Sequence, residues 1–130
     1  MSLARSKIRP ILEVEDLKLS YGDYQVLENV SFSAKKGECL VVMGGSGCGK
    51  STLLKSMIGL LPPIEGKVLV DSVDLWSLKT QEKNSIFRKY GVLFQGGALW
   101  GAMNLVENVS LPLEIHTELR SSEIEEDRKE

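Results

Sequence analysis

Near the N-terminus, apolar and polar residues alternate along two stretches, 12–21 and 30–34. Alternation with a period of two is typical of strands that bury one face and expose the other to water. Gly22 and Asp23, which lie between the two stretches, are residue types that favour turns. We therefore predict two half-buried strands that are antiparallel neighbours in one sheet.

A different hydrophobic pattern begins at residue 39. Residues 39–43 are apolar without alternation, which is typical of a strand covered on both faces, as in a parallel sheet. Residues 91–94 have the same pattern, and we predict a second buried strand there that ends at Gln95. Between them, apolar residues at helical spacing predict a helix over 51–58, and Gly59 is placed to end it.

Shorter elements are predicted in the rest of the chain. Residues 68–70 form a short strand pattern, and residues 81–88 favour a helix. The stretch 105–113 stays open between helix and loop because a proline interrupts it. Ser122 and Glu125 have the spacing of a capping box, which predicts an exposed helix in the charged C-terminal segment.

A glycine-rich motif lies between the first non-alternating strand and the helix that follows. Its sequence, GGSGCGKST, matches the P-loop pattern in full. Glycines allow backbone N–H groups to turn toward an anion, and the positive end of the helix dipole faces the same point. We predict nucleotide binding by all nine residues: Gly44, Gly45, Ser46, Gly47, Cys48, Gly49, Lys50, Ser51 and Thr52. The alternative is a glycine-rich turn that only joins a strand to a helix, and the order strand, loop, helix favours the phosphate site.

Two of these residues have individual roles in the P-loop interpretation. Lys50 is expected to bridge the β- and γ-phosphates of the nucleotide. The Ser51 hydroxyl is expected to be a ligand of Mg²⁺, which neutralises phosphate charge.

Composition and charge narrow the classes of function. The chain has 130 residues, 42% of them hydrophobic and 26% charged, which suits one small globular domain or part of a larger one. A formal net charge of −2 gives no reason to expect a nucleic-acid partner. No apolar run approaches the roughly 20 residues that span a bilayer, and no secretory signal pattern is present. We therefore expect a cytoplasmic protein that reaches a membrane only through a partner.

Segments on both sides of the P-loop resemble ABC transporter ATPase domains. Residues 17–21 (LKLSY) and 26–32 (VLENVSF) resemble the start of these domains, where an aromatic at the Tyr21 position stacks on adenine. Residues 91–95 (GVLFQ) resemble the strand and glutamine of the family's Q-loop. The resemblance implies that Gln95 is catalytic, helps to hold Mg²⁺ and the attacking water, and links the site to the membrane subunit. Taken alone, Tyr21 is also compatible with a core aromatic, and Gln95 with a surface residue.

Within this family, residues 96–100 and 106–113 are similar to the ATPase subunit of Mla-type bacterial phospholipid-trafficking transporters. The implied fold is α/β, a P-loop NTPase with an ABC-type ATPase core and an antiparallel β subdomain. Residues 1–10 are then an N-terminal extension, 11–95 the N-terminal half of the core, and 96–130 the Q-loop and the start of the helical subdomain.

The resemblance also implies cofactors and partners. The cofactors are ATP and Mg²⁺. The partners are a transmembrane permease subunit and a second ATPase subunit in a head-to-tail dimer, with no nucleic acid. The expected location is peripheral, on the inner face of the cytoplasmic membrane.

The resemblance ends near residue 116, before the family's signature loop, Walker B carboxylates and switch histidine. Phosphoryl transfer needs a phosphate clamp and a group that positions the attacking water. Two hypotheses follow: the ATP-binding portion of a transporter ATPase that couples hydrolysis to transport, of phospholipid in particular, or a non-hydrolysing nucleotide-binding or permease-docking fragment. A small P-loop kinase that uses Asp71 ranks last, because the sequence shows no residues for an acceptor site. Asp71 is better explained as a turn residue, and His116 as a surface residue.

The missing half of the domain also has a consequence for packing. In the family, strands from the later half lie between the strand before the P-loop and the strand before the Q-loop. Without them, the strand over 39–43 has an unpaired apolar edge, which predicts aggregation unless another chain covers it.

Overall fold

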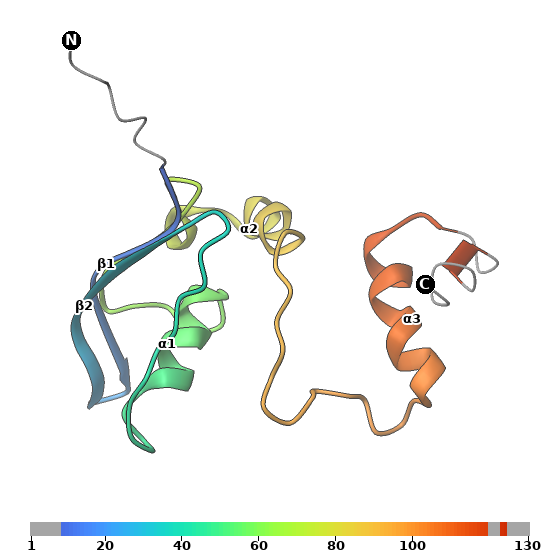
Figure 1. Ribbon diagram of the computed structural model, residues 1–130, viewed down its shortest axis with the longest axis horizontal. Coiled ribbons are helices and arrows are strands. Elements are labelled where there is room, and N and C mark those ends of the chain that lie inside the picture. The colour runs from blue at the N-terminus through green and yellow to red at the C-terminus, as the bar shows by residue number, and fades with distance from the viewer. Residues whose placement is uncertain (1–8, 120–122, 125–130) are drawn as a thin grey trace, which may run out of the picture. The chain divides into compact units, whose positions relative to one another are not determined.

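The computed structural model describes residues 9–119 and 123–124. The C-terminal helix predicted from Ser122 and Glu125 lies outside these residues. The chain divides into two compact units, unit 1 (Met1–Lys89) and unit 2 (Tyr90–Glu130). Unit 1 contains the sheet with helices α1 and α2, and unit 2 contains helix α3 (Figure 1).

The sheet of unit 1 has four strands in the order β2-β1-β3-β4, all of them paired antiparallel. The strands are β1 (Pro10–Tyr21), β2 (Tyr24–Lys35), β3 (Glu65–Val70) and β4 (Val73–Asp74). The pairing of β1 with β2 across Gly22 and Asp23 confirms the predicted hairpin, and β3 confirms the strand predicted at 68–70. Gly22 has φ 56°, a conformation that glycine adopts without strain.

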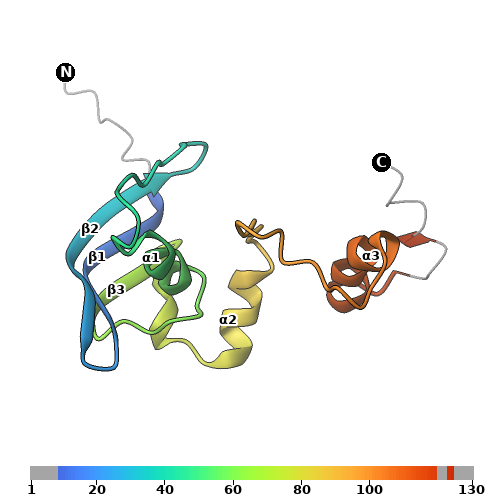
Figure 2. The same ribbon diagram turned by 90° about the horizontal axis from the view of Figure 1, so that it is seen from below.

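One face of this sheet is covered by helix α1 (Lys50–Met57), as Figure 2 shows. Alternating apolar residues of the strands meet Leu53 of α1 in one core, as the predicted burial of one strand face requires. Its buried members are Val14, Leu17, Leu19, Leu53, Val68 and Leu75. Helix α1 confirms the helix predicted over 51–58, and Gly59 follows its end with φ 79°.

Two further short helices complete unit 1. They are the 3₁₀ helix η1 (Leu75–Ser77) and α2 (Thr80–Phe87), and α2 confirms the helix predicted over 81–88. Asp74 caps η1 by accepting a hydrogen bond from the Trp76 N–H at 3.0 Å.

The backbones of β1 and β3 approach each other very closely at a register shift between Glu15 and Lys18. A Cβ at Gly66 would clash with the carbonyl oxygens of Glu15 and Asp16, the latter at 2.5 Å. Asp16 itself has φ 43°, and its N–H donates to the Ser31 hydroxyl at 2.8 Å. The bulge therefore needs glycine at position 66.

The prediction of buried strands over 39–43 and 91–94 is wrong. Neither segment belongs to a ladder, and their side chains are not buried: Met43 and Leu93 are each 87% exposed. A strand is stabilised by hydrogen bonds to a neighbouring strand. Within the described residues, neither segment has a strand beside it. The two segments are apolar, but no part of the chain that the structure describes covers them.

The exposed segment 39–43 leads to a prediction about solubility. Val41 is 67% exposed between other exposed apolar residues, so this stretch is available to pair with another chain. We expect Val41→Lys to raise the protein concentration at which light scattering first increases, because a lysine on an exposed strand opposes edge pairing.

The matched control for this prediction is Ile64→Lys. Ile64 is 57% exposed in a loop, and its replacement adds the same charge outside segment 39–43. An equal gain in both variants would show that net charge, and not the segment, limits solubility.

Unit 2 contains helix α3 (Leu105–His116). Asn104 begins it with a capping box: its side chain accepts from the Glu107 N–H at 3.0 Å, and the Glu107 carboxylate accepts from the Asn104 N–H at 2.7 Å. Pro112 lies inside the helix without ending it, so the stretch left open at 105–113 is helical. Among the described residues, no helix is long and apolar enough to cross a membrane.

Candidate functional site

The glycine-rich loop ends where α1 begins, in unit 1. Gly49 is the N-cap residue of α1 with φ 97°, and Gly47 has φ 78°. Both angles lie in the left-handed region, where residues other than glycine are strained. The first intrahelical bond of α1 runs from the Leu53 N–H to the Gly49 carbonyl at 2.8 Å. The preceding N–H groups at this helix end therefore have no helical acceptor and can bind an anion.

The Lys50 ammonium folds back over the loop. Its Nζ donates to the carbonyl oxygens of Gly44 at 2.8 Å and Gly45 at 2.6 Å, and lies 3.5 Å from Cys48 Sγ. All three contacted atoms belong to the loop, so the positive charge of the Lys50 side chain lies against the loop. Phosphate oxygens are stronger acceptors for an ammonium than these neutral carbonyls. The geometry is therefore suited to an anion.

Close packing leaves no space for side chains at two of the glycines. A Cβ on Gly44 would lie 2.5 Å from Cys48 Sγ. A Cβ on Gly49 would lie 2.9 Å from Leu27 and 3.0 Å from Val26, both in β2. Gly49 is thus required both by its backbone conformation and by its packing against β2, whereas a side chain at Gly44 would have to displace the Cys48 side chain.

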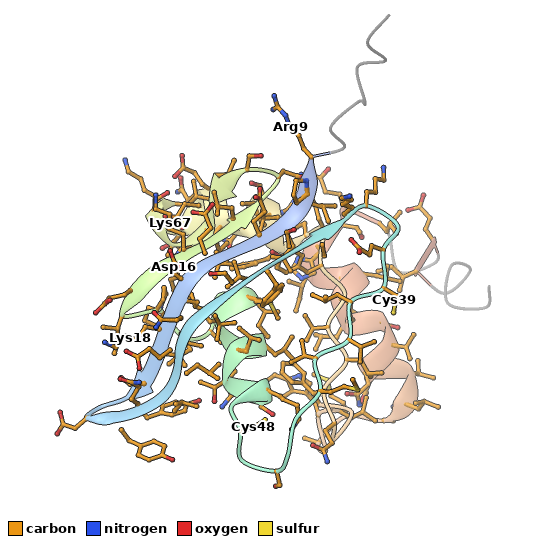
Figure 3. The ribbon with its side chains drawn as sticks, turned by 60° about the vertical axis from the view of Figure 1, so that its left-hand side comes forward. Arg9, Asp16, Lys18, Cys39, Cys48 and Lys67 are labelled. Atoms are coloured by element: carbon orange, nitrogen blue, oxygen red, sulfur yellow. The ribbon has the colours of Figure 1, made fainter. Side chains whose placement is uncertain are left out.

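The remaining motif residues differ in exposure. Ser46, Cys48 and Ser51 are exposed, whereas Thr52 is buried in the first turn of α1. Figure 3 shows Cys48 in the loop beside the start of α1. The Ser51 hydroxyl is therefore accessible to a ligand from solvent.

Tyr21 lies at the end of β1 and is placed beside α1. Its hydroxyl accepts a hydrogen bond from Lys55 Nζ at 3.3 Å, and the same ammonium is 5.7 Å from the centre of the ring. The ring remains 47% exposed. The structure therefore brings Tyr21 and the helix that follows the P-loop together in unit 1. Sequence reasoning missed Lys55, although its spacing of four residues from Ser51 indicates a shared helix face.

Gln95 belongs to unit 2, where it is exposed in the segment that precedes α3. Its role in catalysis and metal binding stays a prediction. Asp71, in contrast, is confirmed as a turn residue: it has φ 51°, follows β3, and pairs with Lys89 at 3.1 Å. His116 is exposed in the last turn of α3.

Comparison with protein families identifies the family of the chain. The sequence model described as ABC transporter matches residues 27–130. The chain belongs to the ABC transporter family. The matched residues include the glycine-rich loop and α1.

Individual ABC transporter proteins also resemble the chain. It is 44% identical over 113 residues to the probable ribonucleotide transport ATP-binding protein mkl of Mycobacterium leprae, covering 87% of this chain and 33% of that protein. It is 38% identical over 109 residues to the intermembrane phospholipid transport system ATP-binding protein MlaF of Haemophilus influenzae, covering 84% of this chain and 41% of that protein. The chain thus spans between a third and about two fifths of the length of these two relatives.

Solved ABC cassettes share the fold. The dimeric structure of MJ0796, a bacterial ABC transporter cassette, matches with a TM-score of 0.79 at 33% identity, over 91% of this chain and 53% of that chain. A post-hydrolysis state of the same ATP-binding cassette, bound to ADP and Pi, matches with a TM-score of 0.78 at 30% identity, over 90% of this chain and 53% of that chain. The fold is therefore that of an ABC-type ATPase core with an antiparallel β subdomain.

Proposed function

We propose that this chain is the ATP-binding portion of an ABC transporter ATPase subunit. One observation carries the proposal: the Lys50 ammonium is held inside a glycine-rich loop, at the N-terminal end of α1. A fixed cation and unpaired N–H groups at one point favour a polyphosphate over a neutral ligand. The ADP-bound cassette that shares this fold supports a nucleotide as the source of the phosphates.

The nucleotide and its metal are assigned to the predicted residues. Residues 44–52 hold the phosphates, Tyr21 stacks on the base, and Ser51 and Gln95 hold Mg²⁺. The exposed Ser51 hydroxyl fits a hard cation, which keeps several waters and phosphate oxygens as its other ligands. When bound, Mg²⁺ neutralises charge on the phosphates. Gln95 is then the residue that orients the attacking water.

The proposed setting is that of an ABC transporter, the family to which the chain belongs. A second ATPase subunit in a head-to-tail dimer and a transmembrane permease subunit are the proposed partners, on the inner face of the cytoplasmic membrane. Phospholipid is the proposed transported substrate, supported by the similarity to MlaF, whose name states phospholipid transport. The similarity to mkl, named for ribonucleotide transport, makes ribonucleotides the competing substrate class.

A second candidate function is nucleotide binding without hydrolysis. It rests on the same contacts of Lys50 with the loop, which suit a bound nucleotide whether or not hydrolysis follows. In this case the chain binds MgATP, and phosphate release stays at the level of a protein-free blank.

The binding proposal is tested by titrating the chain, with Mg²⁺ present, against a fluorescent ATP analogue, and then displacing the analogue with ATP, tripolyphosphate or AMP. We expect ATP and tripolyphosphate to displace it and AMP to do so far less well, because the loop binds the β- and γ-phosphates. Equal displacement by AMP and ATP would contradict a phosphate-binding loop. Phosphate release measured on the same samples distinguishes the two candidate functions.

A further inference from the structure

We propose that Lys55 is a positioning residue for the base of the bound nucleotide, and that it acts by holding the Tyr21 ring. The inference rests on the proposed function, because it assigns a part of the same site. It adds a residue outside the P-loop motif, one turn of α1 beyond Ser51.

Lys55 connects two elements that are far apart in the sequence. Its Nζ reaches the hydroxyl of Tyr21 at 3.3 Å, across 34 positions of the chain. Within the described residues, this is the hydrogen bond that the Tyr21 hydroxyl makes. The same ammonium is 5.7 Å from the ring centre, inside the range of about 6 Å in which a cation is attracted to a ring. Both distances describe one contact, an ammonium at the hydroxyl end of the ring, and this contact restrains the aromatic side chain.

Tyr21 needs such a restraint. It is the last residue of β1, next to the turn at Gly22, and its ring is 47% exposed. An exposed aromatic at the end of a hairpin is otherwise expected to change rotamer freely, and ordering it on binding reduces affinity. Lys55 orders the ring before the base arrives, and the exposed part of the ring remains available for stacking.

The Lys55 ammonium is not paired with a carboxylate of the described residues. Lys18 and Lys89 make ion pairs with carboxylates, whereas no carboxylate of the described residues lies within 4.0 Å of the Lys55 ammonium. Lys55 lies four residues after Ser51, so both side chains project from the same face of α1. In Figures 1 and 3 the β1–β2 turn and the loop before α1 lie at the same end of unit 1. The contact therefore lies beside the proposed phosphate site.

The test compares nucleotide and tripolyphosphate binding by the full chain. We expect Lys55→Ala to weaken ATP binding about three- to fivefold, the effect of losing one exposed cation–ring contact, and to leave tripolyphosphate binding unchanged. Lys55→Arg should retain ATP affinity, because a guanidinium also donates hydrogen bonds and stacks on rings. In a Tyr21→Ala background, Lys55→Ala should have no further effect, because the residue acts through the ring.

A matched control is available in the same unit. The Lys83 ammonium lies 4.3 Å from the centre of the Trp76 ring, in a contact between α2 and η1. Lys83→Ala removes one lysine from one aromatic ring, as Lys55→Ala does, and should leave the affinity for ATP unchanged.

Three results would overturn the inference while leaving ATP binding established. They are unchanged ATP affinity in Lys55→Ala, an equal loss of ATP and tripolyphosphate binding, or an equal effect of Lys55→Ala with and without Tyr21. The second result would mean that Lys55 attracts phosphate directly. A wild-type chain that bound neither ligand would refute the proposed function and this inference with it.

Discussion

Lys50→Ala is expected to weaken MgATP binding by about 100-fold or more. The ammonium of Lys50 lies inside the loop, with acceptors at 2.8 and 2.6 Å from its Nζ. On binding, these carbonyls are exchanged for phosphate oxygens. Losing two charge-assisted hydrogen bonds, each worth about 1.5–3 kcal/mol, corresponds to at least two powers of ten in the dissociation constant. Titration with the fluorescent ATP analogue measures this change.

Lys67→Ala is the control for the loss of a positive charge. Lys67 lies on β3, and Figure 3 shows it on the sheet, away from the Cys48 loop. Its variant has the same net charge as Lys50→Ala, so it should bind ATP with nearly the wild-type affinity. If both variants lost affinity equally, general electrostatic attraction would explain the binding and the loop would have no special role. If neither did, the phosphate-clamp interpretation would fail.

Gly66→Ala is expected to lower the free energy of unfolding by about 3–4 kcal/mol, because two separate costs add. Position 66 has φ 86°, which strains any residue with a Cβ. The new Cβ would also meet the backbone carbonyls of Glu15 and Asp16, which cannot move without opening the β1–β3 ladder. Urea unfolding followed by circular dichroism measures the change.

Gly37→Ala separates these two costs. Gly37 has φ 80°, nearly the angle of Gly66, but nothing lies within 4 Å of the Cβ that an alanine would add. Its replacement should therefore cost only the backbone strain, about 1–2 kcal/mol. Equal losses in both variants would show that the close approach of β1 and β3 contributes nothing to stability.

Local patterns were sufficient to predict the antiparallel hairpin, β3, α1 and α2. In each case the deciding interactions are near in sequence or lie on one buried face: the turn at Gly22, the alternation along β1, and Gly59 after α1. The P-loop could also be identified without a structure, since glycine positions, a lysine and a hydroxyl at fixed spacing are local requirements. Residues 105–113 were undecided because Pro112 interrupts them, and in the structure they are helical, with a capping box at Asn104.

The same reasoning failed where the outcome depends on a distant partner. Residues 39–43 and 91–94 have the apolar pattern of buried strands, but among the described residues neither has a strand beside it. Periodicity reports what a segment is suited to contact, and it cannot report whether that neighbour is present. The contact of Lys55 with Tyr21 was missed for a related reason, because it joins residues 34 positions apart.

By itself, the sequence determined the presence of the P-loop pattern, the hairpin, the first helix and the family to which the chain belongs. These depend on residue types at fixed short spacing, so they can be recognised in one dimension. Only the tertiary structure showed that the backbone of β1 lies too close to position 66 for any side chain, so that a glycine is needed there. It also showed that Lys55 lies against the ring of Tyr21. Both depend on how the chain folds back on itself, because a contact between distant residues forms only after the sheet and α1 have packed together.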